Sequence, residues 1–173
     1  MPKSSKETLE KHEQKVIKIL KRHGNISIDE LAKKCGFSRQ KVWRILKKLD
    51  KEKTIWGYSA IDDAPKQNLK YYILLVKRSM TPFSDSMRKE VINQQLDDYL
   101  EGITIQDIYL THGFYDVVVI LQSDSLLTTK KFVTILNQKL GEYLQEVQIM
   151  EALLPIRVRG IKNPDVKNLI DLL

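Results

Sequence analysis

The sequence has 173 residues, a net charge of +7 and a single cysteine. This length suits one ordinary domain or two small ones, and one cysteine excludes an intrachain disulfide. The longest apolar runs, of about six residues, are far below the ~20 that a bilayer span requires, and the first ten residues lack the apolar core of a signal peptide. The sequence therefore predicts a cytoplasmic protein.

The charge is distributed unevenly along the chain. Residues 1–60 carry a net charge of +9, whereas the remainder carries −2. A basic first third joined to a nearly neutral remainder indicates a module that binds a polyanion and a second module with another role. The alternative is that the abundant lysines serve only solubility.

Three helices are expected in the basic part of the chain, at residues 6–22, 28–35 and 38–51. Ser27 and Glu30 form a capping box that starts the second helix, and Ser38 is the N-cap of the third. The buried faces of the three helices should meet in one core. Its expected members are Ile17, Leu20, Leu31, Phe37, Val42, Leu46 and Leu49.

The third helix has an apolar side and a side rich in cations and amides, which suits a DNA major groove. Arg39, Gln40 and Arg44 on its first turns are candidates for contacts to base edges. Trp43 either stacks on a sugar or a thymine methyl group, or packs against the first helix or Trp56. The DNA-contact candidates are Ser38, Arg39, Gln40, Lys41, Trp43, Arg44, Lys47 and Lys48, with the three lysines assigned to phosphates. For each of them the alternative is an ordinary solvated helix residue.

After the third helix, residues 54–61 have the composition of a strand, which would form the wing of a winged helix-turn-helix. The next residues contain Pro65 and little apolar pattern, so they read as a linker. The expected organisation is a DNA-binding domain at 1–61, a linker at 62–69, a second domain at 70–158 and a tail at 159–173.

The second domain alternates strands and helices. Strands are expected at 70–78, 103–111, 115–122 and 145–154, and helices at 86–100 and 125–140. The order strand, helix, strand, strand, helix, strand predicts a ferredoxin-like α/β sandwich, so the whole chain is of the α+β class. A short terminal helix over 165–173 is a further expectation.

Two of the expected strands contain uninterrupted apolar sequence, at residues 71–76 and 117–121. A strand with one face in water should alternate, so continuous runs indicate a sheet covered on both faces. Two helices cover one face of a four-stranded sheet, which leaves the other for a second copy of the chain in a two-fold dimer. The alternative is that long loops cover these central strands.

Several features together resemble one known family. Residues 28–38 read as a helix-turn-helix, and Ile55-Trp56-Gly57-Tyr58-Ser59-Ala60 is similar to the family's Ile-x-Gly-Tyr-x-Ala. Between the two middle strands, Gly113-Phe114-Tyr115-Asp116 is similar to the family's Gly-Asp-(Tyr/Phe)-Asp turn. With the order of elements in the second half, these motifs resemble the Lrp/AsnC, or feast/famine, transcription regulators over residues 8–158.

The resemblance implies a sequence-specific DNA-binding transcription regulator that forms homodimers and assembles further into tetramers or octamers. It also implies an amino-acid effector bound between dimers, near the turn between the middle strands. The effector-binding candidates are Gly113, Phe114, Tyr115 and Asp116. Phe114 stands where the family most often has an acidic residue, and an aromatic ring cannot accept a hydrogen bond from an amino group as a carboxylate does. For Asp116 the alternative is a structural bond to nearby backbone.

Two other functions remain as alternatives to a specific regulator. One is an architectural, nucleoid-type DNA binder with little base preference. The other is an enzyme subunit similar to sirohaem decarboxylase, whose family uses His and Arg around a tetrapyrrole. His112 is the single histidine of the second half, so the sequence favours a protein that is not an enzyme. The spacing of the histidines and the cysteine predicts no metal, and no cofactor is expected.

Overall fold

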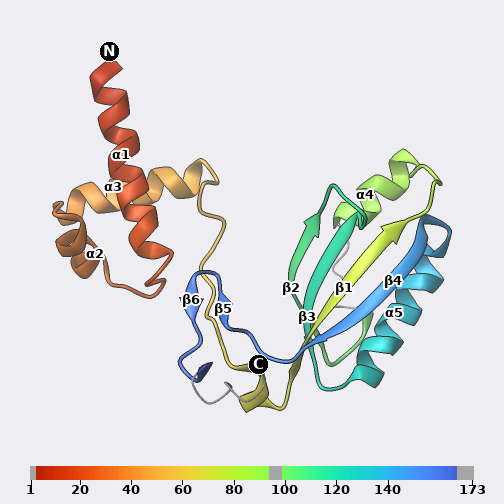
Figure 1. Ribbon diagram of the computed structural model, residues 1–173. Helices are drawn as coiled ribbons and strands as arrows, with labels where there is room; N and C mark the ends of the chain where they lie inside the picture. The colour runs from red at the N-terminus through yellow and green to blue at the C-terminus, as the bar shows by residue number, and fades with distance from the viewer. Residues whose placement is uncertain (1–2, 94–98, 167–173) are drawn as a thin grey trace. The chain divides into compact units, whose positions relative to one another are not determined.

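The computed structural model describes residues 3–93 and 99–166 (Figure 1). The chain divides into two compact units. The first comprises residues 1–62 together with 156–173, and the second comprises residues 63–155, in each case as far as the structure describes them.

The first unit contains three helices, α1 (Lys3–Leu20), α2 (Ile28–Cys35) and α3 (Arg39–Lys51). Both expected caps are present, since the Ser27 hydroxyl accepts a hydrogen bond from the Glu30 N–H at 3.2 Å and the Ser38 hydroxyl accepts one from the Lys41 N–H at 3.3 Å. Gly36 lies between α2 and α3 with φ of 64°, a left-handed conformation that glycine adopts at little cost. Local sequence therefore sets where α2 ends and where α3 begins.

The three helices pack around one apolar core, but Leu46 is only half-buried and Ile45 takes its expected place. At about 100° per residue, positions 45 and 46 both fall within about 60° of positions 42 and 49, so helix periodicity alone does not decide which of the two is buried. The buried members are Val16, Leu31, Ala32, Cys35, Val42, Ile45 and Leu49. The expected members Ile17, Leu20 and Phe37 pack against them while partly exposed.

The wing strand expected over residues 54–61 is wrong: all of these residues are described, and none of them is in a strand. Trp56 in this segment is 94% exposed. A strand requires a hydrogen-bonded neighbour, and the segment pairs with none in the described chain. The expected linker contains a short 3₁₀ helix, η1 (Ala64–Gln67).

The tail adds a small hairpin that the sequence did not suggest. Its strands, β5 (Arg157–Val158) and β6 (Ile161–Lys162), are antiparallel. Arg159 and Gly160 connect them with φ values of 46° and 86°, as in the two-residue turns that suit the twist of a hairpin. The expected terminal helix over 165–173 lies almost entirely outside the described residues.

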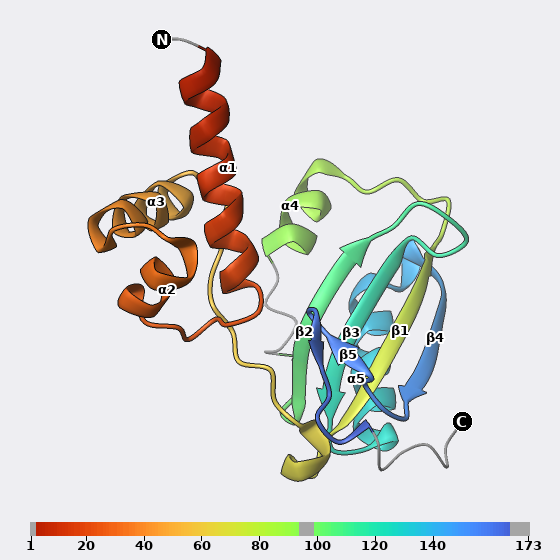
Figure 2. The same ribbon diagram turned by 60° about the vertical axis from the view of Figure 1, so that its left-hand side comes forward.

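The second unit is an antiparallel sheet of β1 (Lys70–Arg78), β2 (Ile103–Leu110), β3 (Val117–Ser123) and β4 (Leu144–Ala152), in the order β2-β3-β1-β4. Helices α4 (Asp85–Asn93) and α5 (Leu126–Leu140) lie on one face of it (Figures 1 and 2). The predicted ferredoxin-like sandwich is confirmed. Residues 94–98 of the helix expected at 86–100 lie outside the described residues.

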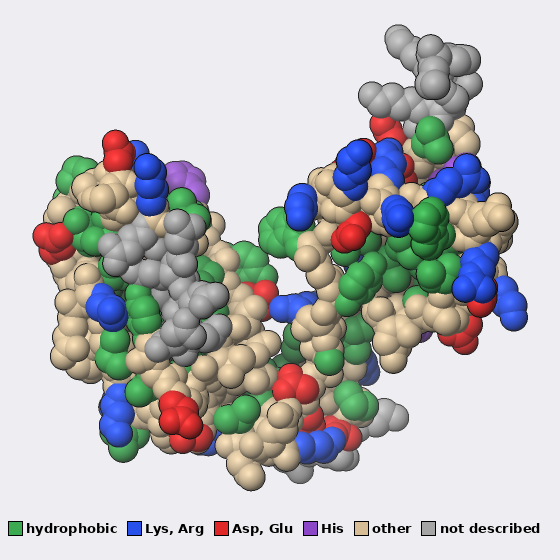
Figure 3. Space-filling model, turned by 180° about the vertical axis from the view of Figure 1, so that it is seen from behind, with side chains coloured by type: hydrophobic (Ala, Val, Ile, Leu, Met, Phe, Trp, Pro, Cys, Tyr) green, Lys and Arg blue, Asp and Glu red, His purple; other side chains and the backbone are tan. Residues whose placement is uncertain are grey.

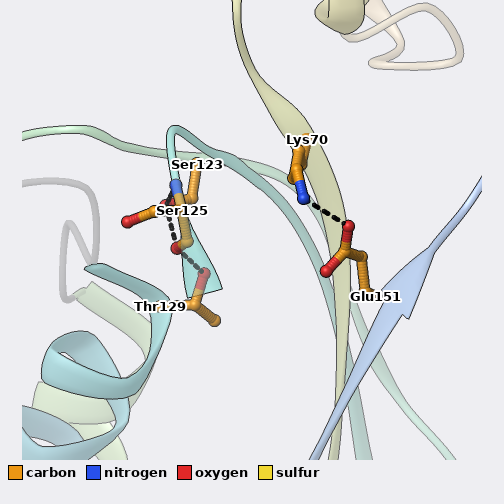
Figure 4. A network of polar contacts seen from close by, with 5 residues as sticks. All are labelled: Lys70, Ser123, Ser125, Thr129 and Glu151. Carbon is orange, nitrogen blue, oxygen red and sulfur yellow. Dashed lines mark hydrogen bonds and ion pairs between the residues drawn. The ribbon is translucent and has the colours of Figure 1, made fainter. Parts of the chain in front are cut away.

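Two sets of polar contacts fix the end of the sheet where β1 begins (Figure 4). Lys70 on β1 pairs with Glu151 on β4 at 2.8 Å. Ser125 is the N-cap of α5, since its hydroxyl accepts from the Thr128 N–H at 3.1 Å. The Ser125 carbonyl in turn accepts from the hydroxyls of Ser123 and Thr129, both at 3.1 Å. These bonds hold the start of α5 against the end of β3.

The core of this unit lies between the sheet and the helices, and its buried members are Tyr72, Leu74, Val76, Ile103, Val119, Leu121, Phe132 and Leu136. The alternate residues Ile73 and Leu75 of β1 point to the other face, where they pair with Ile120 and Val118 of β3. They are half-buried, so both faces of the central strands are apolar, as the sequence indicated. Within residues 3–93 and 99–166, no helix is long and apolar enough to cross a membrane.

Candidate nucleic-acid interface

The structure brings four of the DNA-contact candidates to one surface of the first unit. Arg39, Gln40, Trp43 and Arg44 line a surface depression of ≈ 670 Å³ together with Ile28. Residues three and four positions apart are neighbours on a helix surface, so Trp43 lies beside both Arg39 and Gln40, and Arg44 lies beside Gln40, on the first turns of α3. The depression is therefore built mainly from the helix that the sequence assigned to base recognition.

Trp43 belongs to this surface. It is 48% exposed, and the Lys47 ammonium lies over its ring, with 4.2 Å between Nζ and the ring centroid. Trp56 is 94% exposed, so Trp43 does not pack against Trp56, which was one of the alternatives that the sequence left open. Lys47 follows Trp43 by one helical turn, which places a cation beside an accessible indole.

Arg39 also contacts an acidic residue. Its Nη1 lies 3.4 Å from Oδ2 of Asp29 on α2, and both side chains are well exposed. An exposed ion pair is weak because water screens it and the two side chains lose freedom. Arg39 is therefore oriented by Asp29 without being removed from the surface.

Lys41 and Lys48 do not line this depression. The Lys41 ammonium lies 4.1 Å from the centroid of the Phe37 ring. Lys48 bonds to Glu13 of α1 at 2.6 Å, and this hydrogen bond raises the pKa of Lys48. Because the side chain of Lys48 is tied to α1, it anchors α3 against its neighbour. Ser38, the remaining candidate, has its hydroxyl engaged as the N-cap.

Neither acidic partner was predictable from the sequence. Asp29 and Glu13 come from other helices, and they meet Arg39 and Lys48 only through the packing of three helices. Figure 3 shows Lys and Arg side chains (blue) spread over the face of the first unit that this view presents, with few Asp and Glu side chains (red) between them. In the described part of the chain, no group of three or more His, Cys, Asp or Glu is placed to hold a metal ion.

The effector-binding candidates lie in the second unit, at the turn between β2 and β3. Asp116 is fastened to β1, since its Oδ2 accepts a hydrogen bond from the Arg78 N–H at 2.7 Å and its own N–H donates to the Val76 carbonyl at 2.9 Å. Its carbonyl accepts from the Thr111 N–H at 2.8 Å. Asp116 thus bonds to nearby backbone groups, which was the alternative to an effector contact that the sequence left open.

The rest of this turn is more accessible. Phe114 is 68% exposed, and the Lys77 ammonium lies 4.2 Å from its ring centroid. The Tyr115 ring stands edge-on to Phe114 at 5.0 Å, and its hydroxyl donates to Oε1 of Gln148 at 2.6 Å. The turn therefore presents Gly113 and Phe114 to solvent, while Tyr115 and Asp116 hold it to the sheet.

One protein family and one curated protein are similar in sequence to this chain. Residues 9–55 match the winged helix-turn-helix DNA-binding family. The uncharacterized HTH-type transcriptional regulator YugG of Bacillus subtilis (strain 168) is 25% identical over 127 residues, which are 73% of this chain and 74% of YugG.

Two solved structures share the fold over most of the chain. An AsnC family transcriptional regulator from Agrobacterium tumefaciens superposes with a TM-score of 0.66 and 19% identity, covering 90% of this chain and 97% of that one. A transcriptional regulator from Neisseria meningitidis, solved as its L-Met complex, superposes with a TM-score of 0.65 and 19% identity, covering 94% and 98%.

Residues 9–55 of the first unit are thus similar to the winged helix-turn-helix DNA-binding family, with α2 and α3 in the positions of the helix-turn-helix. Over most of its length the chain has the fold of the Lrp/AsnC transcription regulators, as the resemblance found in the sequence predicted.

Proposed function

We propose that this protein is a sequence-specific, DNA-binding transcription regulator of the cytoplasm, and not an enzyme. The observation that carries this proposal is the exposed face of α3, where Arg39, Gln40, Trp43 and Arg44 line one depression within the residues that match a DNA-binding family. Arg pairs with guanine and Gln with adenine through two hydrogen bonds each, and a helix of this size fits the major groove.

We propose further that the protein binds DNA as a homodimer or a larger assembly. Ile73, Leu75, Val118 and Ile120 make the sheet face away from α4 and α5 apolar, which supports a second copy on that face. The two recognition helices of a dimer would enter major grooves about 34–36 Å apart, so the expected operator is palindromic.

The decisive experiment is selection of bound duplexes from a random pool, followed by affinity measurements on the selected and random sequences. Arg44→Ala is expected to weaken binding to the selected site by about 1–3 kcal/mol, the range for one bidentate base contact, and to relax the preference at one position. Arg22→Ala is the matched control, because Arg22 is also exposed but lies outside the depression.

The control should leave the preference for the selected site intact, since Arg22 lies outside the depression and a contact to phosphate carries no sequence information. If Arg44→Ala retains the full preference for the selected site, the assignment of Arg44 to a base edge is wrong. Equal affinity of the parent protein for selected and random duplexes at several salt concentrations would indicate an architectural binder instead.

For the second unit, we propose an amino-acid effector that contacts the turn at Gly113, Phe114, Tyr115 and Asp116. Support comes from the L-Met complex of the similar Neisseria meningitidis regulator and from the exposure of Phe114. A thermal-shift screen of the twenty amino acids should find at least one stabiliser, and Phe114→Ala should remove its effect without lowering the basal melting temperature. A screen without a stabiliser would refute the proposal.

A further inference from the structure

A cavity of ≈ 500 Å³ lies inside the second unit, between the sheet and its two helices. Its walls come from β1, β2, β3 and β4 as well as from α4 and α5, which lie on the same side of the sheet (Figure 2). Val76, Val119 and Leu136 of the core are among the wall residues. A volume between about 300 and 1,000 Å³ with mainly apolar walls is typical of sites for small molecules.

The cavity is open to solvent, and its opening is apolar. Ile92 of α4 and Ile108 and Leu110 of β2 line it, and they are 82%, 48% and 86% exposed. Three large apolar side chains that border one opening leave an unusual amount of apolar surface in water. An apolar molecule that enters the cavity would cover this surface and gain the corresponding hydrophobic free energy.

The charged residues that line the cavity are all cationic. They are Arg78 at the end of β1 and Arg88 of α4, and the described lining contains no Asp or Glu. Nε of Arg78 is buried and has no hydrogen-bond partner in the described structure, although the guanidinium stacks on Phe83 with 4.0 Å between Cζ and the ring centroid. A buried N–H of a charged group without an acceptor is costly, and a carboxylate matches the guanidinium geometry.

We propose that this cavity binds a small hydrophobic carboxylic acid, with its apolar body against Val76, Val119 and Leu136 and its carboxylate on Arg78. Such a ligand differs in chemistry from an amino acid, because the described lining offers no carboxylate to the ammonium group of an amino acid. None of residues 113–116 lines the cavity, although Leu110 and Val117 on either side of that turn do. The inference does not depend on DNA binding.

The test uses isothermal titration calorimetry on the full chain without DNA, with octanoate, decanoate and indole-3-acetate as probes. At least one acid is expected to saturate one site per chain at concentrations up to about 1 mM. The neutral counterparts 1-octanol and indole-3-acetamide, together with the zwitterion L-leucine, should bind at least tenfold more weakly than the matching acid.

Two variants address the two halves of the proposed contact. Arg78→Met keeps an apolar stem and removes the guanidinium, so it should weaken binding of the acid about tenfold to a hundredfold. Ile108→Trp should block the opening, and it should fold because Ile108 is already half-exposed. Arg157→Met is the matched control, since Arg157 is an exposed arginine of the first unit. This variant should bind the acid with the affinity of the parent chain.

Several results would overturn the proposal. One is that none of the three acids binds. Another is that the neutral counterparts bind as tightly as the acids, or that Arg78→Met binds with the affinity of the parent chain, since either result removes the carboxylate from the recognition. Unchanged binding to Ile108→Trp would place the ligand elsewhere. Because DNA is absent from each titration, failure of the proposed regulator function would leave these outcomes unaffected.

Discussion

The carboxylate of Asp116 is expected to contribute to the stability of the second unit, and Asp116→Ala measures how much. The substitution leaves the Arg78 N–H without the acceptor that now lies 2.7 Å away, while the backbone bonds of Asp116 to Val76 and Thr111 can persist. A hydrogen bond to a charged group contributes about 1.5–3 kcal/mol, and water reaches this half-buried site, so the expected loss is about 1–2 kcal/mol. Asp116→Asn keeps an acceptor oxygen and should lose about half as much.

The assay has to report on the second unit by itself. Both tryptophans, Trp43 and Trp56, lie in the first unit, so tryptophan fluorescence follows the unfolding of that unit. Circular dichroism in the far ultraviolet reports on the unfolding of both units in urea, so the tryptophan transition identifies the part of the signal that belongs to the three helices of the first unit. Amide hydrogen exchange at Arg78 gives a local measurement, and its protection should fall about fivefold to thirtyfold in Asp116→Ala.

Glu7→Ala is the control for the loss of a carboxylate as such. Glu7 pairs with Lys11 on the exposed surface of α1 at 2.9 Å, and such pairs contribute less than about 0.5 kcal/mol. If Asp116→Ala costs no more than this control and the exchange of the Arg78 amide is unchanged, the bond does not hold the turn. Asp116 would then be available to bond a ligand in place of the Arg78 amide.

Three further predictions concern buried groups and a helix cap. Tyr72 is fully buried and its hydroxyl has no hydrogen-bond partner in the described chain, so Tyr72→Phe should leave the urea stability unchanged or raise it by up to about 1 kcal/mol. Ser125→Ala removes the N-cap of α5 and should lower the free energy of unfolding by about 1 kcal/mol, whereas Ser125→Thr should lose less. Burial raises the pKa of the Cys35 thiol, so at pH 8 it should react with Ellman's reagent far more slowly in the folded than in the unfolded protein; equal rates would contradict its burial.

Features set by neighbouring residues could be predicted from the sequence. Ser27 and Ser38 mark the starts of α2 and α3 because a hydroxyl at the N-cap reaches an amide three residues ahead. Gly36 permits the turn between the helices because its φ is positive. In the second unit, the alternation of strands and helices was enough to give the sandwich, because short connections leave few topologies for this order.

Features that depend on packing could not be predicted in this way. Both Ile45 and Leu46 are apolar and one position apart, and only the directions of α1 and α2 decide which of them is buried. The composition of residues 54–61 favours a strand, but composition does not supply the neighbour that a strand pairs with. The cavity could not be predicted from the sequence either. In the sequence Arg78 is an ordinary residue at the end of a strand and Ile108 an ordinary strand residue, and only the fold brings both to the lining of one cavity.

The lysines of α3 show why net charge alone describes such an interface poorly. Lys48 is bonded to Glu13 and Lys41 lies over Phe37, so these two cations stabilise the position of the helix. Lys47 lies beside Trp43, next to the depression that Arg39, Gln40 and Arg44 line. Removal of Lys48 should therefore disturb how α3 sits against α1 and affect all DNA contacts together. Removal of Lys47 should instead take away one phosphate contact and lower the salt dependence of binding by about one counterion.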